Sequence, residues 1–430
     1  MLQYFRRMGR ETELGFLPQR ENIYNQKLPR SRDQDKDSNI YLKEIKLNLS
    51  QAVVNNDISH GGVKWVVNLH KYIILYGLKM SKEDHVYLIK LLFGLLTTKH
   101  VDSVSLDKFA KVLYALMKKK YLITRADLIL PWEPLFDLYK YWEDSTLVLR
   151  GLVKPASGFK AQLKSIIKVS RGYFTIESTQ EMMDKWRHLM CPHDRSICSA
   201  VKYFSLFLPT SRGIPPDKSW KIWLPELNMF WSTWGNSPNW EVDILKLYAR
   251  LAVHQIGELD WEPYMGDLYT RFMVSFNLPV TYGGSGIRLK HGISGQPCVG
   301  SISQWIVSTL GPGSSGQRYL SRLLVALQSY FHPANINNSS ELLHVFISLL
   351  TTQFINRVHT ERFNTKWVCK VAPEKRLTDE DIKEFVLSVK PIAFHVLYNS
   401  YEDEARNVFA NLSLLHPELI IPDLLDNLIF

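Results

Sequence analysis

Six residues near position 311 have the spacing of a nucleotide-binding turn. Gly311-Pro312-Gly313-Ser314-Ser315-Gly316 fits the pattern G-x-G-x-x-G, and an apolar helical stretch follows it from Arg318 to Phe331. In a dinucleotide-binding fold these glycines follow a strand, and an acidic residue stands about 20 positions on. The corresponding segment here, 331–335, contains no acid. We therefore expect a turn between antiparallel helices, while a nucleotide-dependent enzyme, or free N–H groups that hold some phosphate, stays open as an alternative.

A second group contains residue types that bind zinc. The spacing of His188, Cys191, His193 and Cys198 is H-x2-C-x-H-x4-C, which matches no common zinc site. Cys198 also falls on an apolar helical face, where a free cysteine is an ordinary core residue. We predict no metal site. Carboxylates are dispersed and no G-x-S-x-G nucleophile elbow is present, so the sequence predicts that the protein is not an enzyme.

The best candidates for an anionic ligand are the basic residues Lys118, Lys119, Lys120 and Arg125, which lie near one another at a connection between helices. Cations at a helix C-terminus also match the helix dipole, and this cap is the favoured explanation of the lysines. Tryptophans between Trp220 and Trp240 could stack on bases. Four of them share one helical face, however, and core packing is the expected role of such a stripe.

The elements that position these residues are helices. Leu42, Ile45, Leu49 and Ala52 make one apolar face at helical spacing, and this pattern continues almost to the end of the chain. Ser81, with Asp84 three residues later, has the pattern of a helix N-cap, and Gly77 is a plausible stop for the helix before it. Later helices are predicted at 134–142, 157–170, 178–188, 195–208, 219–234, 241–256, 263–276, 300–310, 317–331, 340–360, 378–399, 403–415 and 417–429.

One helix-start phrase occurs twice. Leu130-Pro131-Trp132-Glu133-Pro134 returns as Leu259-Asp260-Trp261-Glu262-Pro263, each time before an apolar helical stretch. Proline suits the first turn of a helix, and the preceding Trp can fold back on the next turn. A repeated device among many helix pairs predicts an all-α fold, an α-solenoid of HEAT- or armadillo-like helical hairpins.

The predicted organisation has two parts. Residues 1–38 are polar and are expected to be mobile or extended. Residues 39–430 are expected to form the solenoid, interrupted by a Gly-rich loop at 283–300. The net charge of +10 over 430 residues allows an anionic partner without defining it. No apolar run is long enough to span a membrane, and four scattered cysteines indicate reduced thiols rather than a disulfide framework.

The chain resembles the proteasome activator complex subunit 4 family, the large HEAT-repeat activators that act without ATP. The resemblance rests on long ordered phrases, and it indicates the N-terminal part of the family's sequence. Four of these phrases are Tyr76-Gly77-Leu78-Lys79-Met80-Ser81-Lys82-Glu83-Asp84-His85, Trp186-Arg187-His188-Leu189-Met190-Cys191-Pro192, Ile256-Gly257-Glu258-Leu259-Asp260-Trp261 and His416-Pro417-Glu418-Leu419.

The resemblance implies a non-catalytic protein that forms part of a dome on the alpha ring of the proteasome core particle. It implies ATP- and ubiquitin-independent degradation of peptides and proteins, including acetylated histones in DNA repair and spermatogenesis, in nucleus and cytoplasm. It also makes inositol phosphates candidate ligands, with no cofactor required, and no specific nucleic acid or membrane partner. The family's tyrosine-containing C-terminal tail and its acetyl-lysine-reading region have no counterpart before Phe430, so histone contact would require regions outside these 430 residues. The alternative function is a generic helical-repeat adaptor that binds a nucleic acid or an acidic protein.

Overall fold

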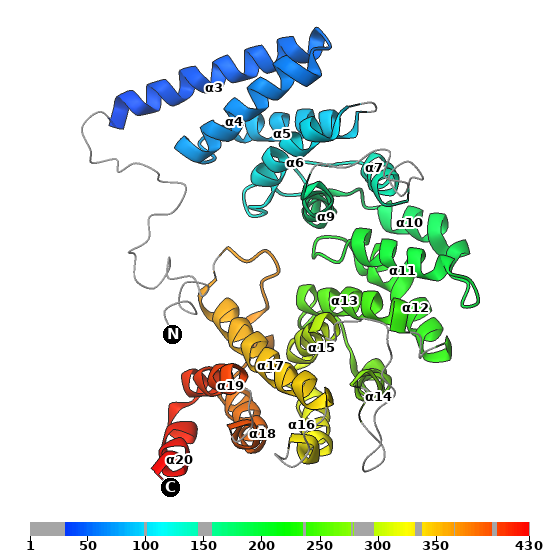
Figure 1. The fold of residues 1–430 in the computed structure, drawn as a ribbon, viewed down its shortest axis with the longest axis vertical. Helices are drawn as coiled ribbons and strands as arrows, with labels where there is room; N and C mark the ends of the chain where they lie inside the picture. The colour runs from blue at the N-terminus through cyan, green and yellow to red at the C-terminus, as the bar shows by residue number, and fades with distance from the viewer. Residues whose placement is uncertain are drawn as a thin grey trace. The chain divides into compact units, whose positions relative to one another are not determined.

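The computed structural model is built from helices (Figure 1). It describes residues 31–429, apart from 99–100, 145–156, 235–237, 277, 279–295, 332–337, 365 and 398–401. Within these ranges the β-structure is an isolated parallel bridge between Leu130 and Phe174. The predicted all-α class is therefore confirmed. The chain divides into two compact units, Met1–Met182 with Leu206–Pro209, and Met183–Ser205 with Thr210–Phe430.

Helices of the first unit pack in two rows. The unit contains α3 (Ser31–Val54), α4 (Val63–Tyr76), α5 (Lys82–Thr97), α6 (Ser103–Met117), α7 (Glu133–Asp144) and α9 (Phe159–Ser170). One row runs from α4 through α6 to α9, the other joins α5 to α7, and the contact of α5 with α6 links them. This is the arrangement of stacked helical hairpins, in which each hairpin buries its apolar face on the next.

The second unit repeats the scheme over more hairpins. The helices that lie wholly within this unit are α12 (Trp220–Trp234), α13 (Pro238–His254), α14 (Met265–Ser275), α15 (Gln296–Thr309), α16 (Gly316–Leu327), α17 (Asn338–Phe363), α18 (Asp379–Leu397), α19 (Glu402–Leu415) and α20 (Pro417–Ile429). One row is α13, α15, α17 and α19, and the other is α14, α16, α18 and α20. The predicted solenoid of helical hairpins is confirmed by this alternation.

Short helical turns and two further helices complete the described elements. Helices α10 (Ser178–Trp186) and α11 (Ser196–Phe207) each contribute residues to both units. A π-helical turn occupies Ile58–Gly62, and 3-10 turns occupy Arg171–Tyr173, Arg187–Leu189, Pro216–Lys218, Glu262–Tyr264, Gln328–Phe331 and Pro373–Lys375. The helices expected from residue 134 onward are all found, with ends that differ by a few residues.

Predicted helix boundaries near residue 80 are confirmed. The N–H of Gly77, which has a φ of 69°, donates to Ile73 O and ends α4. Glycine adopts this left-handed conformation without steric cost. The Ser81 hydroxyl accepts a hydrogen bond of 3.1 Å from the Asp84 N–H and begins α5. Each end satisfies a backbone group that the helix itself leaves unpaired.

The repeated tryptophans also have the predicted position. Trp132 lies directly before α7, is 2% exposed, and contacts Phe136 in the next turn. Its indole N–H donates to Glu181 at 2.7 Å. Trp261 lies before a 3-10 turn and α14, is 6% exposed, and packs edge-on against Trp305. Both rings fill the core at the start of a hairpin.

Two predicted segments lie partly outside the described residues. Residues 1–30 are outside them, whereas Ser31–Ser38 belong to α3, so this stretch is helical and not extended. The charged residues of this stretch are mostly exposed on one side of the helix, while Ser38 is buried and donates to Asp35 O. The predicted Gly-rich loop 283–300 lies outside the described residues up to 295, and residues 296–300 belong to α15.

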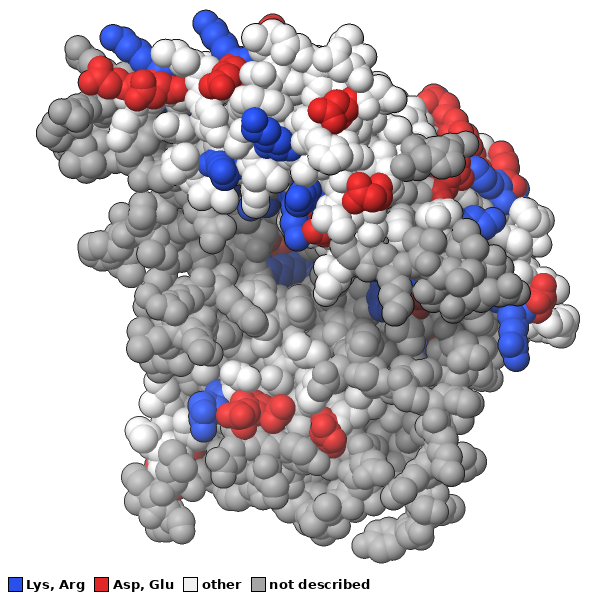
Figure 2. Space-filling model, turned by 45° about the horizontal axis from the view of Figure 1, so that its top comes forward, with Lys and Arg blue, Asp and Glu red and all other residues white. Residues whose placement is uncertain are grey.

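No helix within the described ranges has the length and apolar character to cross a bilayer. On the face shown in Figure 2, basic and acidic side chains are interspersed over the described surface. A nucleic-acid-binding surface usually gathers cations in one patch or stripe. The charge visible on this face therefore does not favour the adaptor function with a nucleic acid.

The Ser81 cap gives a test of this local structure. Ser81→Ala should lower the free energy of local unfolding of α5 by about 1 kcal/mol, because the Asp84 N–H loses its acceptor. Ser81→Gly should cost only about 0.3 kcal/mol, since glycine is tolerated at the N-cap. Hydrogen exchange of peptides from 81–96 measures both. Equal protection in Ser81→Ala and the unchanged protein would contradict the cap.

Candidate functional site

The basic residues predicted as an anion site lie in the connection between α6 and α7. Lys118 directly follows α6, and its N–H donates to Tyr114 O, so the lysines stand at a helix C-terminus as the cap explanation requires. Arg125 lies in the next turn, beside Thr124 and Asp127, whose carboxylate accepts from the Thr124 N–H and hydroxyl. Asp127 also pairs with Lys82 at 2.7 Å.

Arg125 is unusual in this connection. All three of its guanidinium nitrogens are buried and have no hydrogen-bond partner among the described residues. Burial lowers the pKa of Arg125, because a charge removed from water loses its hydration. An unpaired buried charge is costly, so this arginine is the strongest sign in the first unit that a negative group belongs nearby.

The Gly-rich motif forms the turn between α15 and α16. Gly311 and Gly313 have φ values of 137° and 75°, which explains the glycines by backbone geometry alone. The Ser315 N–H and hydroxyl both donate to Glu262, at 2.8 and 2.6 Å. These bonds lower the pKa of Glu262. The chain's own carboxylate thus takes the place at the start of α16 that a phosphate would need.

The zinc-like residues lie around the start of α11 without forming a cluster of ligands. Cys191 is exposed, Cys198 is half-buried on α11, and His193 packs edge-on against Trp234. Within the described ranges no group of three or more His, Cys, Asp and Glu side chains is placed to hold a metal ion.

Two tryptophans of the predicted stripe are confirmed as core residues. Trp223 and Trp231 of α12 are 0% and 2% exposed, and both contact the Tyr248 ring of α13. The Trp231 indole N–H donates to Glu241 at 3.0 Å. These rings are therefore unavailable for stacking on bases, although Trp234 at the end of α12 is 44% exposed.

Arginines that bind the last carbonyls of another helix form the main polar feature of the second unit. Arg271 of α14 donates to Trp231 O and Ser232 O in the last turn of α12, at 3.1 and 2.9 Å. Arg212 donates to His254 O and Ile256 O at the end of α13, at 2.9 and 2.5 Å. Arg250 of α13 donates to Ser205 O at the end of α11. Each guanidinium satisfies carbonyls that the helix leaves unpaired, and its charge matches the helix dipole.

The number of residues between the partners of these contacts is close to the length of one helical repeat. It is 39–40 residues for Arg271, 42–44 for Arg212 and 45 for Arg250. HEAT and armadillo repeats are about 40–47 residues long. The arginines therefore join corresponding points of neighbouring hairpins. Sequence reasoning missed them because an arginine and a carbonyl one repeat away leave no local pattern.

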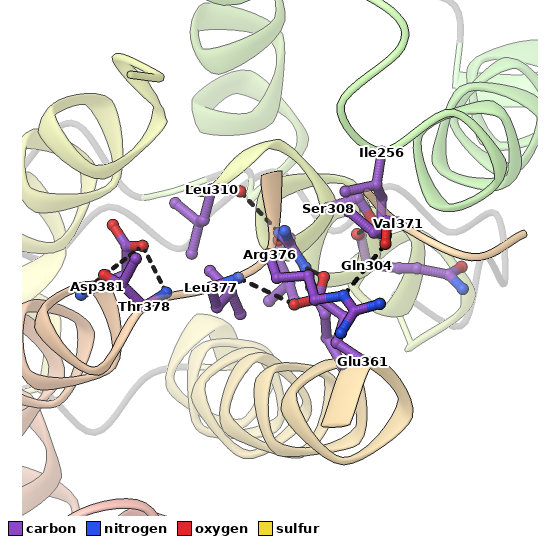
Figure 3. A network of polar contacts seen from close by, with 12 residues as sticks. Ile256, Gln304, Ser308, Leu310, Glu361, Val371, Arg376, Leu377, Thr378 and Asp381 are labelled. Carbon is purple, nitrogen blue, oxygen red and sulfur yellow. Dashed lines mark hydrogen bonds and ion pairs between the residues drawn. The ribbon is translucent and has the colours of Figure 1, made fainter. Parts of the chain in front are cut away.

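The most buried member of this series is Arg357 of α17. Its Nη1 donates to Leu310 O at 2.7 Å and to Val307 O at the end of α15. Its Nε donates to Glu361 at 2.7 Å, and the two side chains are 5% and 2% exposed. Burial lowers the pKa of Arg357, and the charge of Glu361 opposes that fall. The second oxygen of Glu361 accepts from the Leu377 N–H at 3.0 Å (Figure 3).

Three connections therefore meet at one end of the hairpins of the second unit. We define the loop cluster as residues 255–261, 310–315 and 364–378. Arg212 also donates to Lys370 O, and a Cβ on Gly257, where φ is 78°, would stand 2.8 Å from the Lys375 Cβ. The buried Arg357–Glu361 pair joins the turn after α15, through Leu310 O, to the connection after α17, through the Leu377 N–H (Leu310, Glu361 and Leu377 in Figure 3). The arrangement fixes the positions of the loops.

The buried pair allows a direct test. Arg357→Met should lower the free energy of unfolding of the second unit by about 3–5 kcal/mol, because Glu361 and two carbonyls lose their donor. Arg362→Met is the matched control, since its 2.6 Å pair with Asp379 is exposed and should contribute less than about 1 kcal/mol. Urea unfolding followed by circular dichroism measures both. Equal stability of the two variants would show that the pair does not hold the connections.

Known sequences similar to this chain extend along nearly all of it. A family model described as "Proteasome activator complex subunit 4, mid HEAT repeats region" matches residues 320–429. "Proteasome activator complex subunit 4" of Homo sapiens is 37% identical over 418 residues, which is 96% of this chain and 22% of the relative. "Proteasome activator complex subunit 4A" of Danio rerio is 38% identical over 419 residues, or 96% and 23%.

A plant sequence is more distant. "Proteasome activator subunit 4" of Arabidopsis thaliana is 23% identical over 378 residues, or 84% of this chain and 20% of the relative. The chain thus spans about a fifth of the length of the curated relatives it matches. Because the mid-region model matches the last quarter of the chain, the residues before 320 correspond to the N-terminal side of that region.

Proposed function

Because the chain belongs to the proteasome activator complex subunit 4 family, we propose that it forms part of a non-catalytic activator of the proteasome. The observation that carries this proposal is the agreement between the similarity, which extends over 96% of the chain, and the fold. Stacked hairpins that bury their apolar faces on one another give a wide surface for a large partner, and their described site residues serve to join repeats.

The finer proposal is that these hairpins form a section of a dome over the alpha ring of the core particle. In this role the chain promotes degradation of peptides and proteins without ATP or ubiquitin. Such an activator works by differential contact, since a bound protein shifts the gate only as far as it favours the open state over the closed one. Degradation of acetylated histones, with its links to DNA repair and spermatogenesis, would draw on regions of the family outside this chain.

An exchange experiment tests the proposal. In the human relative, the stretch that matches this chain is replaced by these 430 residues, and hydrolysis of a fluorogenic peptide by purified core particles is measured. We expect the chimera to stimulate hydrolysis to within about threefold of the human protein, because sequences at this identity share their packing. A folded chimera that binds core particles but gives no stimulation contradicts the proposal. A chimera with Arg357→Met, which loosens the repeats, serves as the control.

We also propose that an anionic ligand, of the inositol phosphate class by family resemblance, contacts the connection 118–125. The support is local, namely three lysines beside a guanidinium that has no partner among the described residues. Since the nitrogens of Arg125 are enclosed, the ligand would reach them by displacing their neighbours. A multiply charged phosphate is the group for which arginine and lysine are best suited.

Arg125→Met gives the test of this ligand. Calorimetry with inositol hexakisphosphate should show affinity reduced by about tenfold or more, since a hydrogen bond between charged groups is lost. Lys383→Gln on α18 removes the same charge elsewhere and should leave the affinity unchanged. If Arg125→Met raises the melting temperature and keeps the affinity, the arginine is only an unpaired core residue and the ligand proposal fails.

A further inference from the structure

The connection after α17 lines an open pocket that no function above uses. The pocket has a volume of about 220 Å³ and lies within the second unit, between the last turn of α17 and the described residues of the connection that follows it. Its lining includes Asn364, Trp367, Lys370 and Arg376. Small-molecule sites usually measure about 300–1,000 Å³, so this pocket is suited to one or two side chains of a partner.

The charges of the lining are unbalanced. Within the described residues, the Lys370 ammonium has no partner, and Arg376 uses only its Nε, which donates to Val371 O at 3.1 Å. The acid in the lining, Glu361, is 2% exposed, and both of its oxygens are occupied by Arg357 and the Leu377 N–H. Two cations with unused donors therefore face a pocket that offers them no anion.

Hydrogen bonds and buried neighbouring residues fix the backbone that lines the pocket. Arg212 donates to Lys370 O, and Cys369 and Val371 on either side of Lys370 are 5% and 3% exposed. The Arg376 guanidinium is anchored at Nε, and the following Leu377 is tied to Glu361 (Figure 3). A site whose backbone is fixed before binding loses less entropy when a ligand arrives.

An apolar surface adjoins the cations. Trp367 is half-buried in the lining, Phe363 at the end of α17 is 46% exposed, and the neighbouring Val368 is 52% exposed. Tryptophan and arginine are the residues most enriched at the centres of protein interfaces. A ligand for this site therefore combines one negative group with an apolar neighbour.

We propose that this pocket binds a carboxylate side chain of an acidic peptide segment, with an adjacent apolar residue of that segment against Trp367. Arg376 offers a planar pair of donors that matches a carboxylate, and Lys370 adds a point charge. Two cations beside an aromatic ring balance one carboxylate better than a polyphosphate, which requires more charge and more volume. The inference is independent of proteasome activation, since it concerns a partner of the loop cluster itself.

A purely structural role for the same cations can be distinguished from peptide binding by measuring stability and affinity together. Lys370 and Arg376 lie near the C-terminal end of α17, where positive charge favours the helix dipole. In that role, removing either one would lower the melting temperature and leave peptide binding unaffected. In the proposed role, both substitutions reduce peptide affinity, and the melting temperature of Lys370→Gln stays unchanged because that ammonium has no partner among the described residues.

The test uses the 430-residue chain and a fluorescein-labelled peptide, Gly-Leu-Glu-Leu-Glu-Leu-Gly, in a polarisation assay. Lys370→Gln and Arg376→Gln should each weaken binding about tenfold or more, because a hydrogen bond between charged groups is lost. Lys383→Gln is the matched control and should change the affinity less than about twofold. A peptide with glutamine in place of glutamate should bind at least about tenfold more weakly.

Three results would overturn the proposal. The first is an equal loss of peptide affinity in Lys370→Gln, Arg376→Gln and Lys383→Gln, which would mean that only the net charge of the protein attracts the peptide. The second is the absence of measurable binding by the glutamate peptide at millimolar concentration. The third is displacement of the peptide by inorganic phosphate at lower concentration than by glutarate, which would make the pocket a phosphate site.

Discussion

Capping of helix C-termini by arginines from a neighbouring repeat is the interaction on which the second unit depends. A helix leaves its last carbonyls without partners, and a stack of short helices has such an end in every hairpin. Arg212, Arg250, Arg271 and Arg357 supply donors to these ends across one repeat length. Because apolar packing alone is non-directional, these bonds also fix how far one hairpin is rotated against the next.

This constraint explains why side chains of types that could take part in catalysis or ligand binding instead stabilise the scaffold. Glu262 accepts hydrogen bonds at the start of α16, Glu361 joins Arg357 to the connection before α18, and Trp223 and Trp231 of α12 fill the core. These polar groups are partners in bonds that a folded hairpin needs. Arg125, Lys370 and Arg376 keep donors without partners among the described residues and, unlike Arg357, have no carboxylate partner there; for this reason they are the positions where binding is proposed.

Membership of the proteasome activator complex subunit 4 family fits a protein of this construction. A wide surface built from repeats is suited to contact with a large partner. The loop cluster is more rigid than its surface position alone would indicate, because a buried arginine–glutamate pair and three stacked connections support it. Recognition elements on a rigid base discriminate partners better than mobile loops.

The sequence by itself determined the helices, their order and many of their ends. Apolar spacing is a local property, and Ser81, Gly77 and the two Trp-Glu-Pro phrases act within a turn of their own positions. It also determined the family, through phrases that need no coordinates. The polar composition of 31–38 did not indicate that this stretch is the start of α3, in which Ser38 is buried. The tertiary structure alone decided which carbonyl each arginine binds, that Glu262 fills the anion position before α16, and that Lys370 and Arg376 share a pocket. Those relations join residues far apart in the chain, or depend on how a loop folds back, and neither leaves a periodic pattern.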